Sequence, residues 1–156
     1  MPSQEYAILG GLSLNSEKCV ILRFVRGTFS GHDLGPYNSY SLNGKDLHKV
    51  NAHKDLGVMV DNSLRFHMHI RSIANKASGL AANFLKATIC RSRSFMMTLF
   101  ITHGRTLLEY CSCLWNTGYL EDLRMLESVQ RSWTRQIDGM TGLSYKEQLL
   151  ALDLTQ

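Results

Sequence analysis

The segment NSLRFHMHIRSIANKASGLAANFLKATICRSRSFMMTLFITHGRTLL, residues 62–108, decides the fold of this chain of 156 residues. Apolar residues recur in it at steps of three and four, which is the period of an amphipathic helix. The segment contains seven Lys and Arg but no Asp or Glu, whereas residues 1–61 sum to zero charge and residues 109–156 to −3. A field of one sign attracts polyanions. The segment therefore predicts both a helical region and an anionic partner.

Size and composition restrict the class of protein. With 44% apolar residues, the chain can form one domain or two small ones around a core. We expect no membrane partner, because no apolar run is long enough to span a bilayer and no signal peptide is evident. The cysteines form no Cys-x-x-Cys pair, which favours reduced thiols in an intracellular protein, with nucleus and cytoplasm both open. They are Cys19, Cys90, Cys111 and Cys113.

Residues 1–61 carry strand signals. Apolar runs and alternation are typical of short strands, and Asn43-Gly44 is the strongest short hairpin signal. Alternating Leu56, Val58 and Val60 suit a half-buried strand. Strands are expected over residues 19–26, 40–42, 46–50 and 55–60.

Residues 62–156 carry helical signals. Asn62 or Ser63 is placed to cap the first helix, Gly139 to end the third, and Ser144 with Glu147 forms a capping box. Helices are expected from 62 or 63 to about 89, from about 94 to 114, from 122 to 138 and from 144 to 152. The predicted fold class is α+β, with a small antiparallel hairpin and sheet region over residues 1–61 and a bundle of three to four helices over residues 62–156.

The sequence contains no recognisable catalytic constellation. It has no Gly-rich phosphate loop and no pair of carboxylates in an apolar setting. On a helix, His67 and His69 point about 200° apart, at about 100° per residue. A third ligand is also missing, so we expect no metal site and no cofactor.

The basic residues are the better functional candidates. A solvated helix face is the alternative reading, but ordinary surface helices mix both signs of charge. Nothing suggests a helix shaped to read base edges, so backbone phosphates are the expected partner. The candidate phosphate contacts are Arg65, Arg71, Lys76, Lys86, Arg91 and Arg93.

A series of motifs resembles a known family. The series runs through GLSLNSEKC at 11–19, LNG at 42–44, KDLGV at 54–58, LEYC at 108–111, LWN at 114–116, LESVQR at 126–131 and LSYKEQL at 143–149. In this order they resemble the C-terminal part of the reverse transcriptase of non-LTR retrotransposons, of the LINE or jockey-like type. The resemblance covers about residues 11–154.

The resemblance implies roles for individual residues. Residues 12–18 are similar to a motif at the end of the palm, in which the lysine, here Lys18, is a candidate proton donor to the leaving pyrophosphate. Asp55, Leu56 and Gly57 are similar to the primer grip, a hairpin that holds the 3′ end of the primer. The helices after Ser63 would be the thumb, which contacts the phosphates of an RNA/DNA template–primer duplex.

The sequence also departs from the family. The family's polymerase chemistry uses two Mg ions held by palm aspartates, and no Asp-Asp occurs here. Fingers and most of the palm would precede residue 1 and would be missing partners. We therefore expect a fragment that holds no cofactor and does not polymerise alone. The alternative is a co-opted, non-enzymatic module that binds nucleic acid or another protein.

Overall fold

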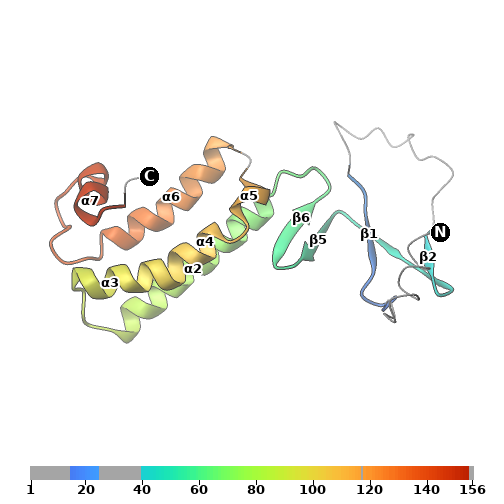
Figure 1. Ribbon diagram of the computed structural model, residues 1–156, viewed down its shortest axis with the longest axis horizontal. Helices are drawn as coiled ribbons and strands as arrows, with labels where there is room; N and C mark the ends of the chain where they lie inside the picture. The colour runs from blue at the N-terminus through green and yellow to red at the C-terminus, as the bar shows by residue number, and fades with distance from the viewer. Residues whose placement is uncertain (1–14, 25–39, 117, 155–156) are drawn as a thin grey trace. The chain divides into compact units, whose positions relative to one another are not determined.

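A computed structural model of the chain describes residues 15–24, 40–116 and 118–154 (Figure 1). The described residues form small sheets followed by helices, which confirms the predicted α+β class. The chain divides into two compact units, Met1–Leu64 and Arg65–Gln156. The boundary lies close to residue 62, where the apolar pattern changes to the helical period.

The strands of the first unit form three separate pairs. The pairs β2–β3 and β5–β6 are antiparallel, and β2–β3 is the hairpin predicted at Asn43-Gly44. The predicted antiparallel arrangement is wrong for β1 and β4, which pair in parallel. The predicted return strand is divided into β3 and β4, and between them the Leu47 N–H donates to the Tyr40 carbonyl over 2.8 Å. The strands are β1 (Val20–Leu22), β2 (Ser41–Leu42), β3 (Lys45–Asp46), β4 (His48–Val50), β5 (Ala52–Asp55) and β6 (Val58–Asp61).

Two hairpin turns shape this unit. Asn43 and Gly44 have φ angles of 53° and 75°, the geometry of a type I′ turn, which confirms the prediction for Asn-Gly. The single strand predicted over residues 55–60 is wrong. Leu56 and Gly57 also have positive φ, 44° and 93°, so this stretch turns back and pairs β5 with β6. The apolar alternation continued across the turn and concealed it. Of the predicted strand 19–26, residues 25 and 26 lie outside the described part.

The second unit is helical. A π-helical segment, η1, joins α3 to α4 without interruption, so the predicted second helix continues only to Glu109. It then breaks where Cys111 adopts a left-handed φ of 54°. The elements are α2 (His67–Ala87), α3 (Arg93–Leu99), η1 (Phe100–Arg105), α4 (Thr106–Glu109), α5 (Ser112–Trp115), α6 (Leu120–Thr134) and α7 (Tyr145–Leu152).

Helix ends differ from the predictions in two places. The predicted cap of the first helix at Asn62 or Ser63 is wrong, because α2 begins only after Phe66. Asp61 instead accepts a hydrogen bond from the Ser63 N–H over 2.9 Å, and such local bonds compete with helix formation. Similarly, α6 ends at Thr134, and Gly139 (φ 80°) lies in the turns that follow it.

The capping box is confirmed. The Ser144 N–H donates to Glu147 Oε2 over 2.7 Å, and the Glu147 N–H donates to Ser144 Oγ over 3.4 Å. The hydrogen bonds from Ser144 hold the pKa of the Glu147 carboxyl below its usual value. This local motif is readable from sequence because its partners are three residues apart.

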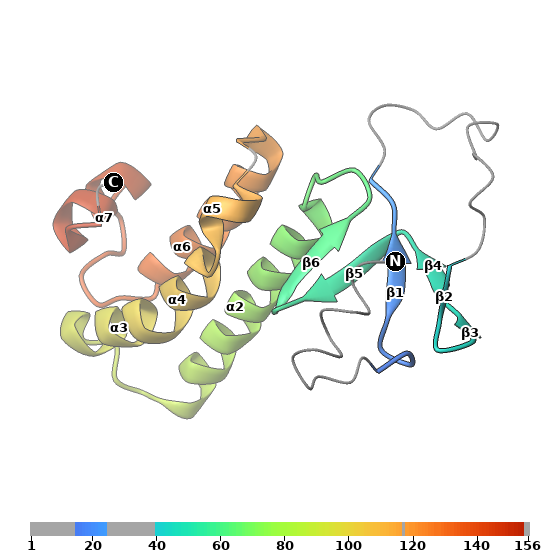
Figure 2. The ribbon, with the colours of Figure 1, turned by 45° about the vertical axis from the view of Figure 1, so that its right-hand side comes forward.

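The core of the second unit lies between its long helices. In both views, α2, the α3–α4 segment and α6 run side by side (Figures 1 and 2), and α2 contacts both. Trp133 on α6 is the largest fully buried side chain, and its indole N–H donates to the Met96 carbonyl over 3.1 Å. The buried clusters contain Ala81, Met96, Phe100, Trp133, Ile137, Met140 and Leu152, and Ala74, Ala77, Leu108 and Val129.

Candidate nucleic-acid interface

The outer face of α2 carries exposed cations. Arg71, Lys76 and Lys86 lie within about 140° of arc, at about 100° per residue, on the side opposite the buried residues of the helix. They extend over about 22 Å of axis, from the rise of about 1.5 Å per residue. These three of the six predicted contacts therefore share one surface.

The residues between these cations are small or uncharged. No acid lies on α2, and Arg71, Lys76 and Lys86 form no ion pair with any described residue. A Cβ atom added at Gly79 would meet nothing within 4 Å, so this part of the face is open. A surface of this kind allows a charged backbone to approach the helix closely. The exposed residues between the cations are Ser72, Asn75, Ser78, Gly79, Ala82 and Asn83.

The other three predicted contacts lie outside this face. Arg65 is exposed just before α2 and has an interaction within the chain. Arg93 is exposed as the first residue of α3. Neither side chain continues the row of cations on α2.

Arg91 caps a helix instead of facing solvent. Its guanidinium donates to the Leu85 carbonyl over 2.7 Å and to the Thr88 carbonyl over 2.6 Å. Further bonds reach Thr88 Oγ1 at 3.2 Å and the Cys90 carbonyl at 3.4 Å. The last carbonyls of a helix lack partners within it, and a basic side chain just beyond the end can satisfy them. In the sequence, the signal for this capping role was the position of Arg91, two residues after the predicted end of the helix at about residue 89.

We therefore expect the Arg91→Met variant to lose stability, not affinity for nucleic acid. Loss of these charged hydrogen bonds should lower the free energy of unfolding by roughly 1–2 kcal/mol, measured by urea denaturation. Arg93→Met is the control, because Arg93 is exposed on the neighbouring helix. Weaker duplex binding by the Arg91 variant at unchanged stability would contradict this role.

The candidate primer-grip residues lie at the tip of the β5–β6 hairpin. Leu56 is 85% exposed and has a φ of 44°, which is uncommon for a residue with a branched, bulky side chain. Such a conformation costs on the order of 1–3 kcal/mol and gathers at functional sites. Asp55 and Gly57 flank it, also exposed. Lys18 is exposed in a turn that precedes β1.

Metal ligands do not gather among the described residues. Over residues 15–24, 40–116 and 118–154, no three His, Cys, Asp or Glu side chains are placed to hold a metal ion. His67 and His69 have different surroundings. His67 is half-exposed, whereas His69 packs edge-on against Trp115, with the two ring centres 5.7 Å apart. Within the same residues, no helix has the length and apolarity that a membrane crossing requires.

One side-chain contact between two helices could not be found from sequence. His67 Nδ1 lies 2.6 Å from Asp122 Oδ1, and Asp122 is buried. The pair joins the first turns of α2 and α6, which are 55 residues apart in the chain. The sequence indicated Asp122 only as an acid favoured near a helix N-terminus. Its partner becomes visible only in the packed helices.

Comparisons with known proteins do not assign the chain to a family. No protein-family model, curated protein or solved structure matches it. The resemblance to reverse transcriptases rests on the sequence motifs alone, and the function of the chain is a proposal.

Proposed function

We propose that this chain binds a nucleic-acid duplex through its phosphates, as a fragment of a non-LTR retrotransposon RNA-directed DNA polymerase. The observation that carries the proposal is the exposed, acid-free face of α2 with Arg71, Lys76 and Lys86. In this proposal the helical unit acts as a thumb on a template–primer duplex, and the β5–β6 hairpin acts as a primer grip.

Charge and shape support contact with phosphates. The three cations are spread over about 22 Å, which suits a row of phosphates better than one small anion. Lysine acts as a point charge without directional preference, and phosphate contacts carry no sequence information. The proposed binding is therefore independent of sequence and strongly weakened by salt.

The hairpin tip supports the second part of the proposal. Leu56 combines an exposed apolar side chain with a strained backbone, so it is a candidate to contact the terminal nucleotide of a primer. Lys18 would act as a proton donor only beside the palm of the parent enzyme. Two Mg ions would supply the polymerase chemistry there, and the aspartate pair that binds them is not in this sequence.

Salt-dependent binding tests the role of α2. The variant with Arg71→Gln, Lys76→Gln and Lys86→Gln should bind an RNA/DNA duplex more weakly. The slope of log K against log salt should flatten by about 3, because each neutralised duplex phosphate contributes about 0.9. The measurement is fluorescence anisotropy with a labelled duplex from 50 to 200 mM salt.

A charge-matched variant controls for net charge. Lys45→Gln, Lys49→Gln and Lys146→Gln remove the same charge from other exposed positions. The proposal fails if this control variant and the α2 variant give the same slope.

The purified chain should not polymerise DNA. We expect no incorporation of dNTPs on a primed RNA template with Mg²⁺ present, because the chain has no Asp-Asp pair. The check is extension of a labelled primer on a denaturing gel, with an active reverse transcriptase as the positive control. Extension by this chain would refute the assignment as an inactive fragment.

A second candidate function is a protein-interaction module. A groove of about 370 Å³ lies between α4, α5 and α6, and it contains Leu108, Trp115, Leu123 and Leu126. Apolar grooves with a polar rim are typical of sites for a partner's apolar side chain. Absence of any duplex binding by the unaltered chain at 50 mM salt would favour this candidate over the first.

A further inference from the structure

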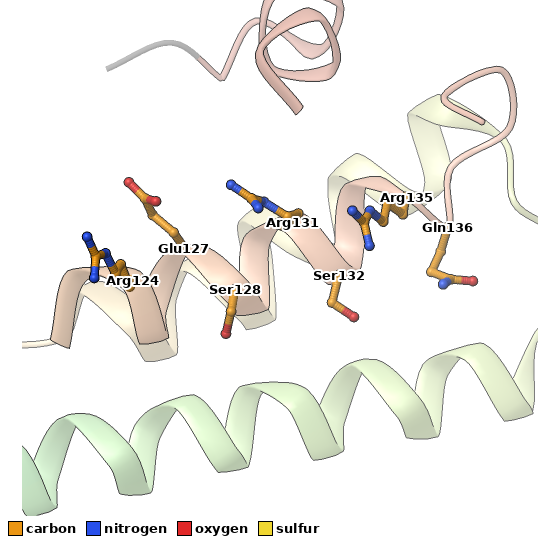
Figure 3. Close-up of a pocket in the computed structure, with 7 residues that line it drawn as sticks. All are labelled: Arg124, Glu127, Ser128, Arg131, Ser132, Arg135 and Gln136. Carbon is orange, nitrogen blue, oxygen red and sulfur yellow. The ribbon is translucent and has the colours of Figure 1, made fainter. Parts of the chain in front are cut away.

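We infer that α6 carries a second nucleic-acid site, separate from the face of α2, which binds the phosphates of a single strand. The site is a shallow hollow of about 410 Å³ along the exposed side of α6 (Figure 3). It is lined by Arg124, Glu127, Ser128, Arg131, Ser132, Arg135 and Gln136.

Three arginines form a row in this hollow. Arg124, Arg131 and Arg135 fall within about 40° on the helix, at about 100° per residue. Figure 3 shows them along one side of α6, with Glu127 between the first two. None of the three forms an ion pair with a described residue, although Glu127 is close in sequence. Their charge is therefore available to an external anion.

Arg131 is held in place by an aromatic ring. Its Cζ atom lies 4.5 Å from the centre of the Tyr145 ring on α7, a cation–π contact. The contact restricts the position of the guanidinium, while Arg131 remains exposed. An ordered guanidinium loses less entropy when it binds an anion, and its fork matches the oxygens of a phosphate.

The length of the row favours a chain of phosphates. Arg124 and Arg135 are eleven residues apart, or about 16 Å along the axis. One phosphorylated side chain would reach only part of this row, whereas successive phosphates of a strand can reach all of it. The lining contains no apolar side chain, so it lacks the apolar face of a membrane site.

A single strand fits this hollow better than a duplex. The hollow offers one row of contacts, and planar guanidinium groups can also stack on unpaired bases. The α2 face differs, because two of its three cations are lysines and small residues separate them. The second site does not depend on duplex binding by α2, so either site can fail a test while the other passes.

Binding of a labelled oligouridylate to the full chain tests the inference. The variant with Arg124→Gln, Arg131→Gln and Arg135→Gln should lose roughly ten- to a hundredfold in single-strand affinity. Its salt slope should flatten by about 2, from about 0.7 per single-strand phosphate. The same variant should bind the duplex with the same affinity as the charge-matched control with Lys45→Gln, Lys49→Gln and Lys146→Gln. The α2 variant should lose affinity for the duplex but bind the single strand with the same affinity as that control.

Two further variants distinguish binding by this arrangement of arginines from binding by positive charge alone. Replacement of the three arginines by Lys keeps the charge but removes the planar guanidinium groups, which can donate two hydrogen bonds to one phosphate. It should weaken single-strand binding several-fold. Ser132→Glu leaves every arginine in place and adds a carboxylate to the hollow, and should also weaken it.

The inference is overturned by any of three results. The first is single-strand binding by the α6 variant equal to that of the charge-matched control. The second is full affinity in the Arg-to-Lys variant. The third is α6-dependent binding of a phosphopeptide that exceeds the binding of the oligonucleotide.

Discussion

Trp133→Ala should lower the free energy of unfolding by about 4 kcal/mol, the middle of the range for replacing a buried Trp or Phe. The side chain is 2% exposed and packs near Phe84 and Phe100, with ring centres 6.3 and 5.6 Å away. The substitution would leave a cavity where α6 meets α2 and the α3–η1 segment. It would also leave the Met96 carbonyl without the indole N–H.

Urea denaturation followed by circular dichroism measures this effect. Trp133→Phe is the matched control, because it keeps most of the buried apolar area and removes only the N–H donor. We expect it to cost about 1–2 kcal/mol, from the lost volume and one lost hydrogen bond, since the Met96 carbonyl keeps the Phe100 N–H. Equal losses for the two variants would assign the effect to the hydrogen bond, and no loss for either would contradict the observed core.

Gln148→Met should be the second most destabilising change, at about 1–3 kcal/mol. Gln148 is buried, and its Nε2 donates to the carbonyls of Met140 and Leu143, each over 3.1 Å. Its Oε1 accepts from Thr134 Oγ1 over 2.8 Å. Methionine has a similar length but no amide, so the Leu143 carbonyl would lose this donor, whereas the Met140 carbonyl would keep the Leu143 N–H over 3.3 Å. Each buried group left without a partner costs about 1–3 kcal/mol.

The same substitution at an exposed glutamine provides the control. Gln136→Met, in the turn after α6, removes an exposed amide and should change the free energy of unfolding by less than about 0.5 kcal/mol. The comparison uses the same denaturation measurement. Equal stability of the two variants would show that the buried network of Gln148 contributes nothing.

Local patterns account for the features that were predicted correctly. The helical period, the Asn43-Gly44 turn and the capping box of Ser144 and Glu147 each depend on residues within a few positions of one another. The acid-free stretch is likewise a property of composition, and it led to the exposed cations of α2. Periodicity alone missed the turn at Leu56-Gly57, because its apolar leucine continued the alternation of a strand, whereas the motif resemblance implied a hairpin there.

Contacts made only in the folded chain account for two roles that were not predicted. Asp122 looked like an ordinary acid at a helix start, yet it is buried against His67. Arg91 counted as one of seven cations, yet carbonyls of α2 occupy its guanidinium. Residue spacing does not predict the contact of Asp122, whose partner is 55 residues away, whereas the bonds of Arg91 are local and its position after the helix was a signal that the charge pattern did not use.

The sequence by itself determined the α+β class, the position of the helical region and its excess of positive charge, because periodicity and charge are local properties. Only the tertiary structure decided which cations are exposed together. Packing buries one side of α2 and of α6, and so leaves Arg71, Lys76 and Lys86 on one helix and Arg124, Arg131 and Arg135 on the other facing outward.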